Sequence, residues 1–148
     1  MASAKEVVDR GLEAWRARDA DAFAACYAED AVITAPGGAE LRGHDGAKAF
    51  MGMWKEAFPD NDITITSEDQ CGSVIWQVGT FSGTHTGNLM TPDGQLIPPT
   101  GRSVSAGYAD RFVVQGDVVV SETLYFDRME LLTQLGLVPQ PETAAASS

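Results

Sequence analysis

The chain has 148 residues, which is enough for one hydrophobic core and too few for two. Its 21 acidic and 10 basic residues give a net charge of -11, which repels nucleic acids and anionic membrane surfaces. No apolar run could span a bilayer, and the first ten residues lack a signal-peptide pattern. We therefore expect one soluble, cytoplasmic domain over residues 1–138, with no nucleic-acid or membrane partner, and a flexible low-complexity tail over 139–148.

Two helices are expected at the start of the chain. Ser3 and Glu6 have the spacing of a capping box, and the apolar residues that follow recur at helical intervals to about Arg18. Asp19 is a second candidate N-cap, which predicts a short helix that ends near Glu29.

A strand, a loop and a third helix are expected next. Residues 31–34 are typical of a short strand, which the sequence Ala-Pro-Gly-Gly after it would end, and we expect a loop as far as Gly43. The third helix ends before Pro59, and its wide apolar stripe consists of Ala47, Phe50, Met51, Trp54 and Phe58.

Beyond Pro59 the apolar period changes from helical to alternating. Ile63 and Ile65 indicate one strand, and residues 73–85 indicate a longer strand after a tight turn near Gly72. The proline-rich stretch 86–101 predicts a long loop, and such loops in small domains are often functional.

The last part of the chain predicts a hairpin and a short helix. Residues 104–114 and 118–126 alternate as strands around the turn 115–117, and Asp127 can cap a helix that Gly136 ends. Helices followed by a run of antiparallel strands indicate an α+β fold, with helices on one face of a curved sheet.

The two hairpin strands each carry one acid on an apolar face. Even-numbered residues are the apolar ones on both strands, apart from Asp110 and Glu122, and Tyr108 shares this face. Aligning the two apolar faces favours a three-residue turn, which places Asp110 directly opposite Glu122. We hypothesise that Asp110 and Glu122 form an acid/base pair in a pocket, with Tyr108 beside them. The alternative is a bulge at Gly107 that turns Asp110 into solvent.

Histidines and cysteines give weaker signals. His85 ends the long strand and could donate a hydrogen bond to a ligand carbonyl or carry a proton, although a lone histidine is more often structural. His44 is expected to be a local cap or a surface residue. Cys26 and Cys71 have no metal-binding spacing and are interpreted as free thiols. We expect no metal and no organic cofactor.

Bulky apolar residues either fill the core or line a cavity for a flat, apolar small molecule. The sequence contains neither a glycine-rich phosphate loop nor a Gly-x-Ser-x-Gly nucleophile motif. The candidate lining residues are Trp15, Phe50, Met51, Trp54, Trp76, Phe81 and Leu124.

Several short motifs carry a family resemblance. They are Tyr27-Ala-Glu-Asp-Ala-Val, His85-Thr86-Gly87, Pro98-Pro99-Thr100-Gly101-Arg102, Leu124-Tyr125-Phe126-Asp127 and Gln134-Leu135-Gly136. Together they resemble the SnoaL-like polyketide cyclases of the nuclear-transport-factor-2-like superfamily, from Lys5 to Leu137. The resemblance implies a cone-shaped, curved mixed or antiparallel sheet wrapped around the N-terminal helices, with an internal apolar pocket. It also implies a homodimer through the outer sheet face, where Ser103, Ser105, Thr123 and Tyr125 would form a polar interface.

The resemblance also indicates where catalytic residues would stand. The family's catalytic aspartate on the last strand aligns with Leu124, or with Thr123 if the gap is moved, and its histidine aligns with Tyr108. Glu122 lies two residues from Leu124 on the same face and could replace the aspartate. The base of the related ketosteroid isomerases precedes a proline, and here Ala35 holds that position, which disfavours steroid isomerisation.

Two function classes follow. The first hypothesis is a cofactor-independent acid/base enzyme that acts on a small hydrophobic carbonyl compound by a cyclase or aldol-type reaction. The alternative is a non-catalytic domain of the same fold that binds a small molecule. Asp110 and Glu122 discriminate the two, because only an enzyme requires one of them to face the cavity.

Overall fold

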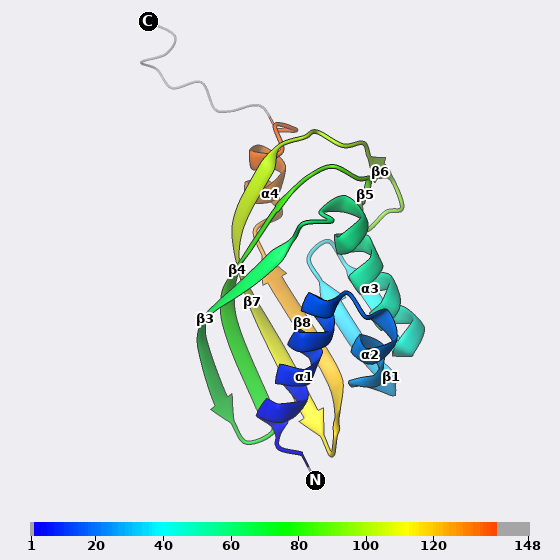
Figure 1. Cartoon of the computed structure of the whole chain (residues 1–148), viewed down its shortest axis with the longest axis vertical. Coiled ribbons are helices and arrows are strands. Elements are labelled where there is room, and N and C mark those ends of the chain that lie inside the picture. The colour runs from blue at the N-terminus through cyan, green and yellow to red at the C-terminus, as the bar shows by residue number, and fades with distance from the viewer. Residues whose placement is uncertain (1, 139–148) are drawn as a thin grey trace, which may run out of the picture.

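The computed structural model describes residues 2–138, in which three helices lie against one face of a curved sheet and a fourth lies at its upper end (Figure 1). The predicted tail at 139–148 lies outside the described residues. The helices are α1 (Ala4–Ala17), α2 (Ala20–Ala25), α3 (Gly43–Ala57) and α4 (Arg128–Gln134). The strands are β1 (Tyr27–Ala35), β2 (Ala39–Arg42), β3 (Asp62–Cys71), β4 (Val74–Thr84), β5 (Leu89–Met90), β6 (Leu96–Ile97), β7 (Ser103–Gln115) and β8 (Val118–Phe126).

The helix caps predicted from the sequence are present. Ser3 accepts a hydrogen bond from the backbone N–H of Glu6, and Asp19 accepts one from the N–H of Ala22. Asp127 caps α4 through the N–H groups of Met129 and Glu130, at 2.9 and 3.1 Å. These caps satisfy backbone donors that have no partner inside the helix, so the helix starts are encoded locally.

The region after α2 differs from the prediction. The helix ends at Ala25, and β1 already begins at Tyr27, which is buried and pairs with Val119 of β8. The predicted loop to Gly43 is wrong in part, since β2 pairs with β1 as an edge strand. Two glycines with positive φ, at positions 37 and 38, allow the tight turn between them.

Six strands form the main sheet, in the order β2-β1-β8-β7-β4-β3. The pair β1 and β8 is parallel, and the other neighbours are antiparallel. The long loop predicted at 86–101 contains the small separate hairpin of β5 and β6. The chain therefore has the α+β architecture that its pattern of elements predicts.

The hydrophobic core lies between the helices and the concave face of the sheet. Phe58, Ile33 and Ile75 are among the largest completely buried side chains there. Removing each such side chain from water stabilises the fold by about 1.5–3 kcal/mol. Within residues 2–138, no helix combines the length and apolar character needed to cross a membrane.

Candidate active site

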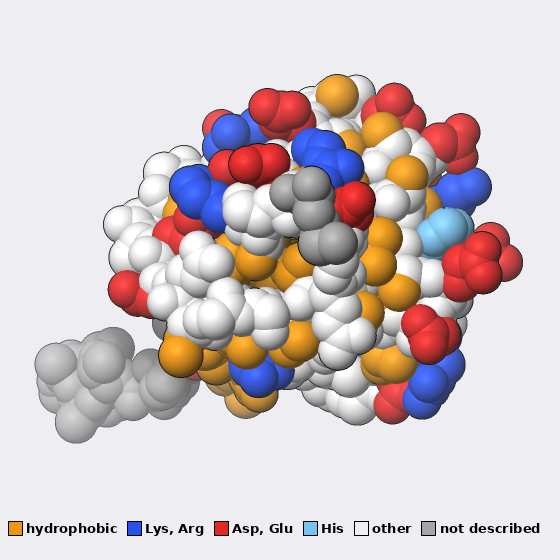
Figure 2. Space-filling view, turned by 90° about the horizontal axis from the view of Figure 1, so that it is seen from below, with side chains coloured by type: hydrophobic (Ala, Val, Ile, Leu, Met, Phe, Trp, Pro, Cys, Tyr) orange, Lys and Arg blue, Asp and Glu red, His pale blue; other side chains and the backbone are white. Residues whose placement is uncertain are grey.

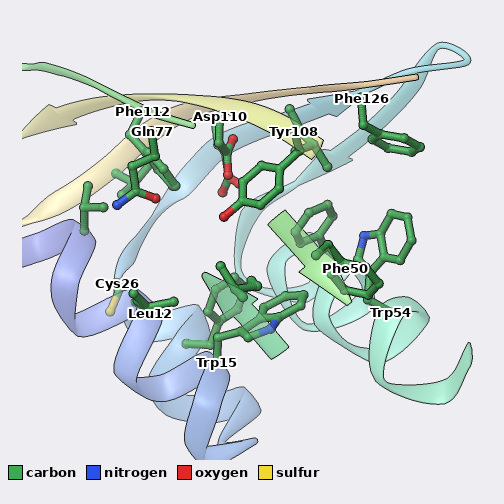
Figure 3. Close-up of a pocket in the computed structure, with 18 of the residues that line it drawn as sticks. Leu12, Trp15, Cys26, Phe50, Trp54, Gln77, Tyr108, Asp110, Phe112 and Phe126 are labelled. Carbon is green, nitrogen blue, oxygen red and sulfur yellow. The ribbon is translucent and has the colours of Figure 1, made fainter. Parts of the chain in front are cut away.

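A cavity lies between the concave face of the sheet and helices α1, α2 and α3 (Figure 3). The cavity has a volume of about 100 Å³ and opens to solvent, and its mainly apolar lining with a few polar groups is typical of small-molecule sites. In the view from the end where α1 begins, hydrophobic side chains are visible in a hollow within a rim of polar and charged groups (Figure 2). The apolar lining includes Leu12, Trp15, Phe50, Trp54, Phe112, Leu124 and Phe126.

Asp110 and Glu122 both line this cavity and are almost fully buried, with 8% and 3% of their surface exposed. They do not lie directly opposite each other as predicted. Asp110 pairs with Leu124, and Glu122 pairs with Phe112, so the two acids are diagonal neighbours on adjacent strands.

The difference arises from the turn of the β7–β8 hairpin. Gln115 pairs with Val118, so the turn has two residues rather than three, and the register then shifts between the Val114–Val119 and Val113–Ser121 pairs. This irregularity leaves Val120 as an additional residue on β8, in the manner of a β-bulge. Before the bulge, the odd-numbered Val119 is the buried residue, and its neighbours Val118 and Val120 are less buried. After the bulge, the even-numbered Glu122 and Leu124 are buried.

The alternative with a bulge at Gly107 is wrong. The pairing of β4 with β7 is uninterrupted from Val74–Val113 to Thr84–Ser103. Because the alternation is preserved through Gly107, Asp110 stays on the buried face.

The acid pair is held by few polar contacts. The Tyr27 hydroxyl donates a hydrogen bond to Oε1 of Glu122. Oδ1 of Asp110 is buried and has no hydrogen-bond partner among the described residues. A buried acceptor without a donor is energetically costly, so this atom is a natural contact for a ligand group that donates.

Burial controls the protonation of the pair. Desolvation raises the pKa of Asp110 well above its usual range, and the charge of Glu122 and hydrogen bonding to it raise this pKa further. Desolvation also raises the pKa of Glu122, although hydrogen bonds from Asp110 and Tyr27 act in the opposite direction. Both carboxyl groups therefore lose their protons at higher pH than exposed carboxyls do, which is a property that suits a general acid or base.

Two tyrosines and one glutamine complete the polar part of the cavity. Burial raises the pKa of Tyr27 and of Tyr108, so both phenols remain hydrogen-bond donors at neutral pH. The Tyr108 ring lies next to Asp110 in Figure 3. Gln77 pairs with Asp110 across β4 and β7, and its Nε2 donates to Glu68 at 2.7 Å. The Gln77 carboxamide is thereby held beside the acid pair.

Sequence reasoning did not identify Tyr27 and Gln77 as site residues. Tyr27 was expected within the second helix, so its position on a strand beside Glu122 was not foreseen. Gln77 is the single polar side chain among residues 75, 77, 79 and 81, which share one face of β4. An unpaired polar residue on a buried strand face was the available signal.

The predicted aromatic and aliphatic ligand contacts divide into two groups. Trp15, Phe50, Trp54 and Leu124 line the cavity, as does Phe81. Met51 is buried in the core without lining the cavity, because it lies on a different part of the α3 stripe.

Trp76 does not line the cavity, and its predicted place there is corrected. It is 39% exposed and stacks on Tyr125, with ring centroids 6.2 Å apart, on the outer face of the sheet. The residues that face inward on β4 are odd-numbered, so an even-numbered residue of this strand points outward.

His85 also lies away from the cavity lining. It is completely buried, its Nδ1 is 3.0 Å from Oγ1 of Thr100, and its ring packs against Phe58. Burial lowers its pKa. This position supports a structural contact with the loop at 86–101 rather than the predicted contact with a ligand. His44 lies in the first turn of α3, where Nε2 is 2.8 Å from the Tyr27 carbonyl oxygen.

Residues 2–138 contain no group of three or more histidine, cysteine or acidic side chains that could hold a metal ion. Cys26 and Cys71 are free cysteines, the first buried and the second exposed. Among the described residues, the titratable groups that line the cavity are the carboxyls of Asp110 and Glu122, the phenols of Tyr27 and Tyr108 and the thiol of Cys26.

Comparisons with known proteins identify the family and the fold. The sequence model of the family described as SnoaL-like polyketide cyclase matches residues 5–135. No functionally curated protein is detectably similar in sequence to this chain.

Several solved structures share the fold. IdmH from Streptomyces antibioticus, a proposed polyketide cyclase, is 24% identical, with 91% of this chain and 99% of that chain covered and a TM-score of 0.75. A proposed SnoaL-like polyketide cyclase from Jannaschia sp. CCS1 is 19% identical, with 92% and 93% covered and a TM-score of 0.80. AclR from Streptomyces galilaeus, a proposed hydroxylase, is 22% identical, with 97% and 91% covered and a TM-score of 0.77. These likenesses establish the nuclear-transport-factor-2-like fold, which hosts more than one activity.

Proposed function

This chain belongs to the SnoaL-like polyketide cyclase family, and we propose that it is a cofactor-independent acid/base enzyme acting on a small hydrophobic carbonyl compound. The observation that carries the proposal is the buried pair of Asp110 and Glu122 in an apolar cavity. Burial raises the pKa of both carboxyl groups above their ordinary values, which favours a role in general acid/base catalysis.

In the proposed mechanism, the substrate lies with its carbonyl group next to Tyr108 and with an adjacent C–H bond next to Asp110. Oδ1 of Asp110 accepts the proton from carbon, and the proton already shared within the pair moves toward Glu122. The Tyr108 hydroxyl donates a hydrogen bond to the carbonyl oxygen as its negative charge increases. Return of a proton to the product oxygen after carbon–carbon bond formation completes an aldol-type closure and restores the pair.

The remaining polar contacts support this arrangement by positioning the acid pair. The hydrogen bond from Tyr27 fixes the Glu122 carboxyl, and Glu68 holds Gln77 on the other side of Asp110. Rigid placement of this kind reduces the reorganisation that proton transfer would otherwise require.

The proposal is tested by hydrogen–deuterium exchange on a model ketone, which does not require the natural substrate. 2-Tetralone is flat and apolar and carries acidic C–H bonds next to its carbonyl. In deuterated buffer at neutral pH, the wild-type protein is expected to accelerate exchange of these hydrogens above the buffer rate, measured by proton NMR. A ligand that binds without any acceleration would instead favour a non-catalytic binding domain, which the mainly apolar lining would also suit.

We also propose that the protein forms a homodimer through the outer face of the sheet. This face has an apolar centre, the outer patch, formed by Trp76, Val78 and Tyr125, which are 39%, 45% and 54% exposed. The interface expected from the sequence was polar, whereas the outer patch would place aromatic groups at its centre, as protein interfaces often do.

Trp76→Glu is expected to convert the dimer to a monomer, because it places a charge in the middle of the outer patch. Sedimentation equilibrium should give about twice the chain mass of 15.7 kDa for the wild type and the chain mass for the variant. Met90→Glu is the control, since Met90 is equally exposed, at 50%, but lies on β5. A monomeric wild type would contradict the proposal.

A further inference from the structure

The polar groups of the cavity are mainly hydrogen-bond acceptors. Within residues 2–138, Oδ1 of Asp110 has no hydrogen-bond partner, and one oxygen of Glu122 accepts a hydrogen bond from Tyr27. Since Nε2 of Gln77 donates outward to Glu68, its carboxamide oxygen remains an acceptor on the side of Asp110. Among these lining groups only the Tyr108 hydroxyl remains as a donor without a described acceptor. A complementary ligand must therefore contribute donors.

The cavity also lacks a positive charge to balance the acids. None of the side chains that line it in the described part of the chain is a lysine, arginine or histidine. The nearby cations have other contacts: Lys5 lies 3.3 Å from Glu68, and Arg16 donates to the Ile63 carbonyl oxygen at 2.8 Å. Lys55 lies over the Trp15 ring, 4.6 Å from its centroid, and donates to Asn61.

The titratable groups around the acid pair do not change this balance. Tyr27, Tyr108 and Cys26 face the cavity with the pair, and burial raises the pKa of each, so all three are neutral at neutral pH. Ionisation of the pair would thus create a buried negative charge without a partner, which is unfavourable unless a ligand supplies the cation.

Aromatic rings surround the same space. Trp15, Phe50, Trp54 and Tyr108 line the cavity. Their electron-rich faces attract cations, most strongly where water is excluded. A cationic head on a flat skeleton would find both an acidic partner and aromatic walls in one cavity.

We infer that the molecule bound in this cavity is a flat apolar amine, whose basic nitrogen donates hydrogen bonds to Asp110 and Glu122. The inference rests on the proposed function in one respect, because it assigns the ligand to the same cavity. Beyond that function, it specifies that the ligand carries a positive charge.

The test compares three aromatic compounds that differ in their polar group: 2-naphthylmethylamine, 2-naphthylmethanol and 2-naphthoic acid. Their dissociation constants are measured by titration calorimetry at pH 7.5. Because a hydrogen bond to a charged group exceeds a neutral one by about 1 kcal/mol or more, the amine is expected to bind about tenfold more tightly than the alcohol. The carboxylate is expected to bind most weakly, since it would meet like charge.

Variants of the acid pair make the test specific to the cavity. In Asp110→Asn/Glu122→Gln the amine should lose its advantage over the alcohol, while the alcohol keeps its affinity. If the double variant does not fold, Glu122→Gln alone is used for the same comparison of amine and alcohol. Ser121→Ala, which alters an outward-facing neighbour of Glu122 on β8, should leave all three affinities unchanged.

The protons released on binding provide a second measurement. An ammonium beside the pair lowers the carboxyl pKa values, so amine binding should release protons to the buffer and strengthen as pH rises from 6 to 8. Binding of the alcohol should show neither effect. Calorimetry in buffers of different ionisation enthalpy measures this release.

Three results would overturn the inference: an amine no tighter than the alcohol, a carboxylate as tight as the amine, or an amine preference unchanged in the double variant. Each is independent of ketone exchange, because that assay uses a neutral ligand and measures proton transfer. If the protein catalyses ketone exchange but shows no preference for the amine, the proposed enzyme activity stands and the amine inference is rejected. If it prefers the amine but does not catalyse exchange, the amine inference stands and the enzyme activity is rejected.

Discussion

Asp110→Asn is expected to slow the exchange of 2-tetralone by about 100- to 10,000-fold, the usual contribution of a general acid/base group. Asparagine has nearly the same shape but cannot accept a proton from carbon. Asp110 is buried beside Glu122, and its Oδ1 has no hydrogen-bond partner among the described residues, so bulk water is not positioned to take over its role. The exchange rate is measured by proton NMR at saturating ketone.

Glu122→Gln should cause a loss of similar size, and the double variant should be little worse than the poorer single variant. Two groups that share a proton act as a unit, so their removal is strongly non-additive. Ser121→Ala is the matched control and should retain the wild-type rate. Every variant should still bind the ketone, which is measured by the rise in its melting temperature when the ketone is added. Wild-type exchange by Asp110→Asn would remove Asp110 from the mechanism.

The free energy of unfolding is expected to fall as pH rises from 5 to 8, relative to that of Asp110→Asn/Glu122→Gln. Burial raises both carboxyl pKa values in the folded protein above their ordinary values of 3.8 and 4.5. The folded state therefore binds more protons than the unfolded chain in this range. The resulting stabilisation is fully present below the ordinary values and is lost as pH passes through the raised values.

Other buried groups contribute with the opposite sign, so the comparison must be made between proteins. The lowered pKa of His85 makes stability increase with pH near its ordinary value of 6.5, and the pKa of Lys55, lowered to about 8, does so at higher pH. Both groups are retained in the double variant, and their contributions cancel in the difference. Urea unfolding at pH 5, 6, 7 and 8 measures the difference in the free energy of unfolding between the wild type and the double variant. A difference that stays constant with pH would show that the pair titrates as exposed acids do.

Family membership alone does not identify the catalytic residues of this chain. The family match covers residues 5–135. The resemblance implies that the family's catalytic aspartate aligns with Leu124, or with Thr123 if the gap is moved, and neither residue is an acid. The structure places Leu124 opposite Asp110 and two residues from Glu122 on the same buried face. An acidic function at this part of the cavity would consequently come from neighbouring positions, which is what the exchange assay examines.

The sequence by itself determined the features that depend on near neighbours. The caps at Ser3, Asp19 and Asp127 follow from side chains that bond to backbone groups two or three residues away. The alternation along β7 was sufficient to place Asp110 on the buried face, because successive side chains of a strand point in opposite directions. The apolar stripe of α3 likewise predicted its buried side.

Only the tertiary structure decided which of these faces and residues meet. The contact between Tyr27 and Glu122 joins residues 95 positions apart, and a single additional residue at Val120 set Asp110 opposite Leu124. On β4, Ile75, Trp76 and Val78 place apolar groups on both faces, so alternation alone could not show that Trp76 faces outward. Such choices depend on the total free energy of packing strands and helices together, which no local pattern contains.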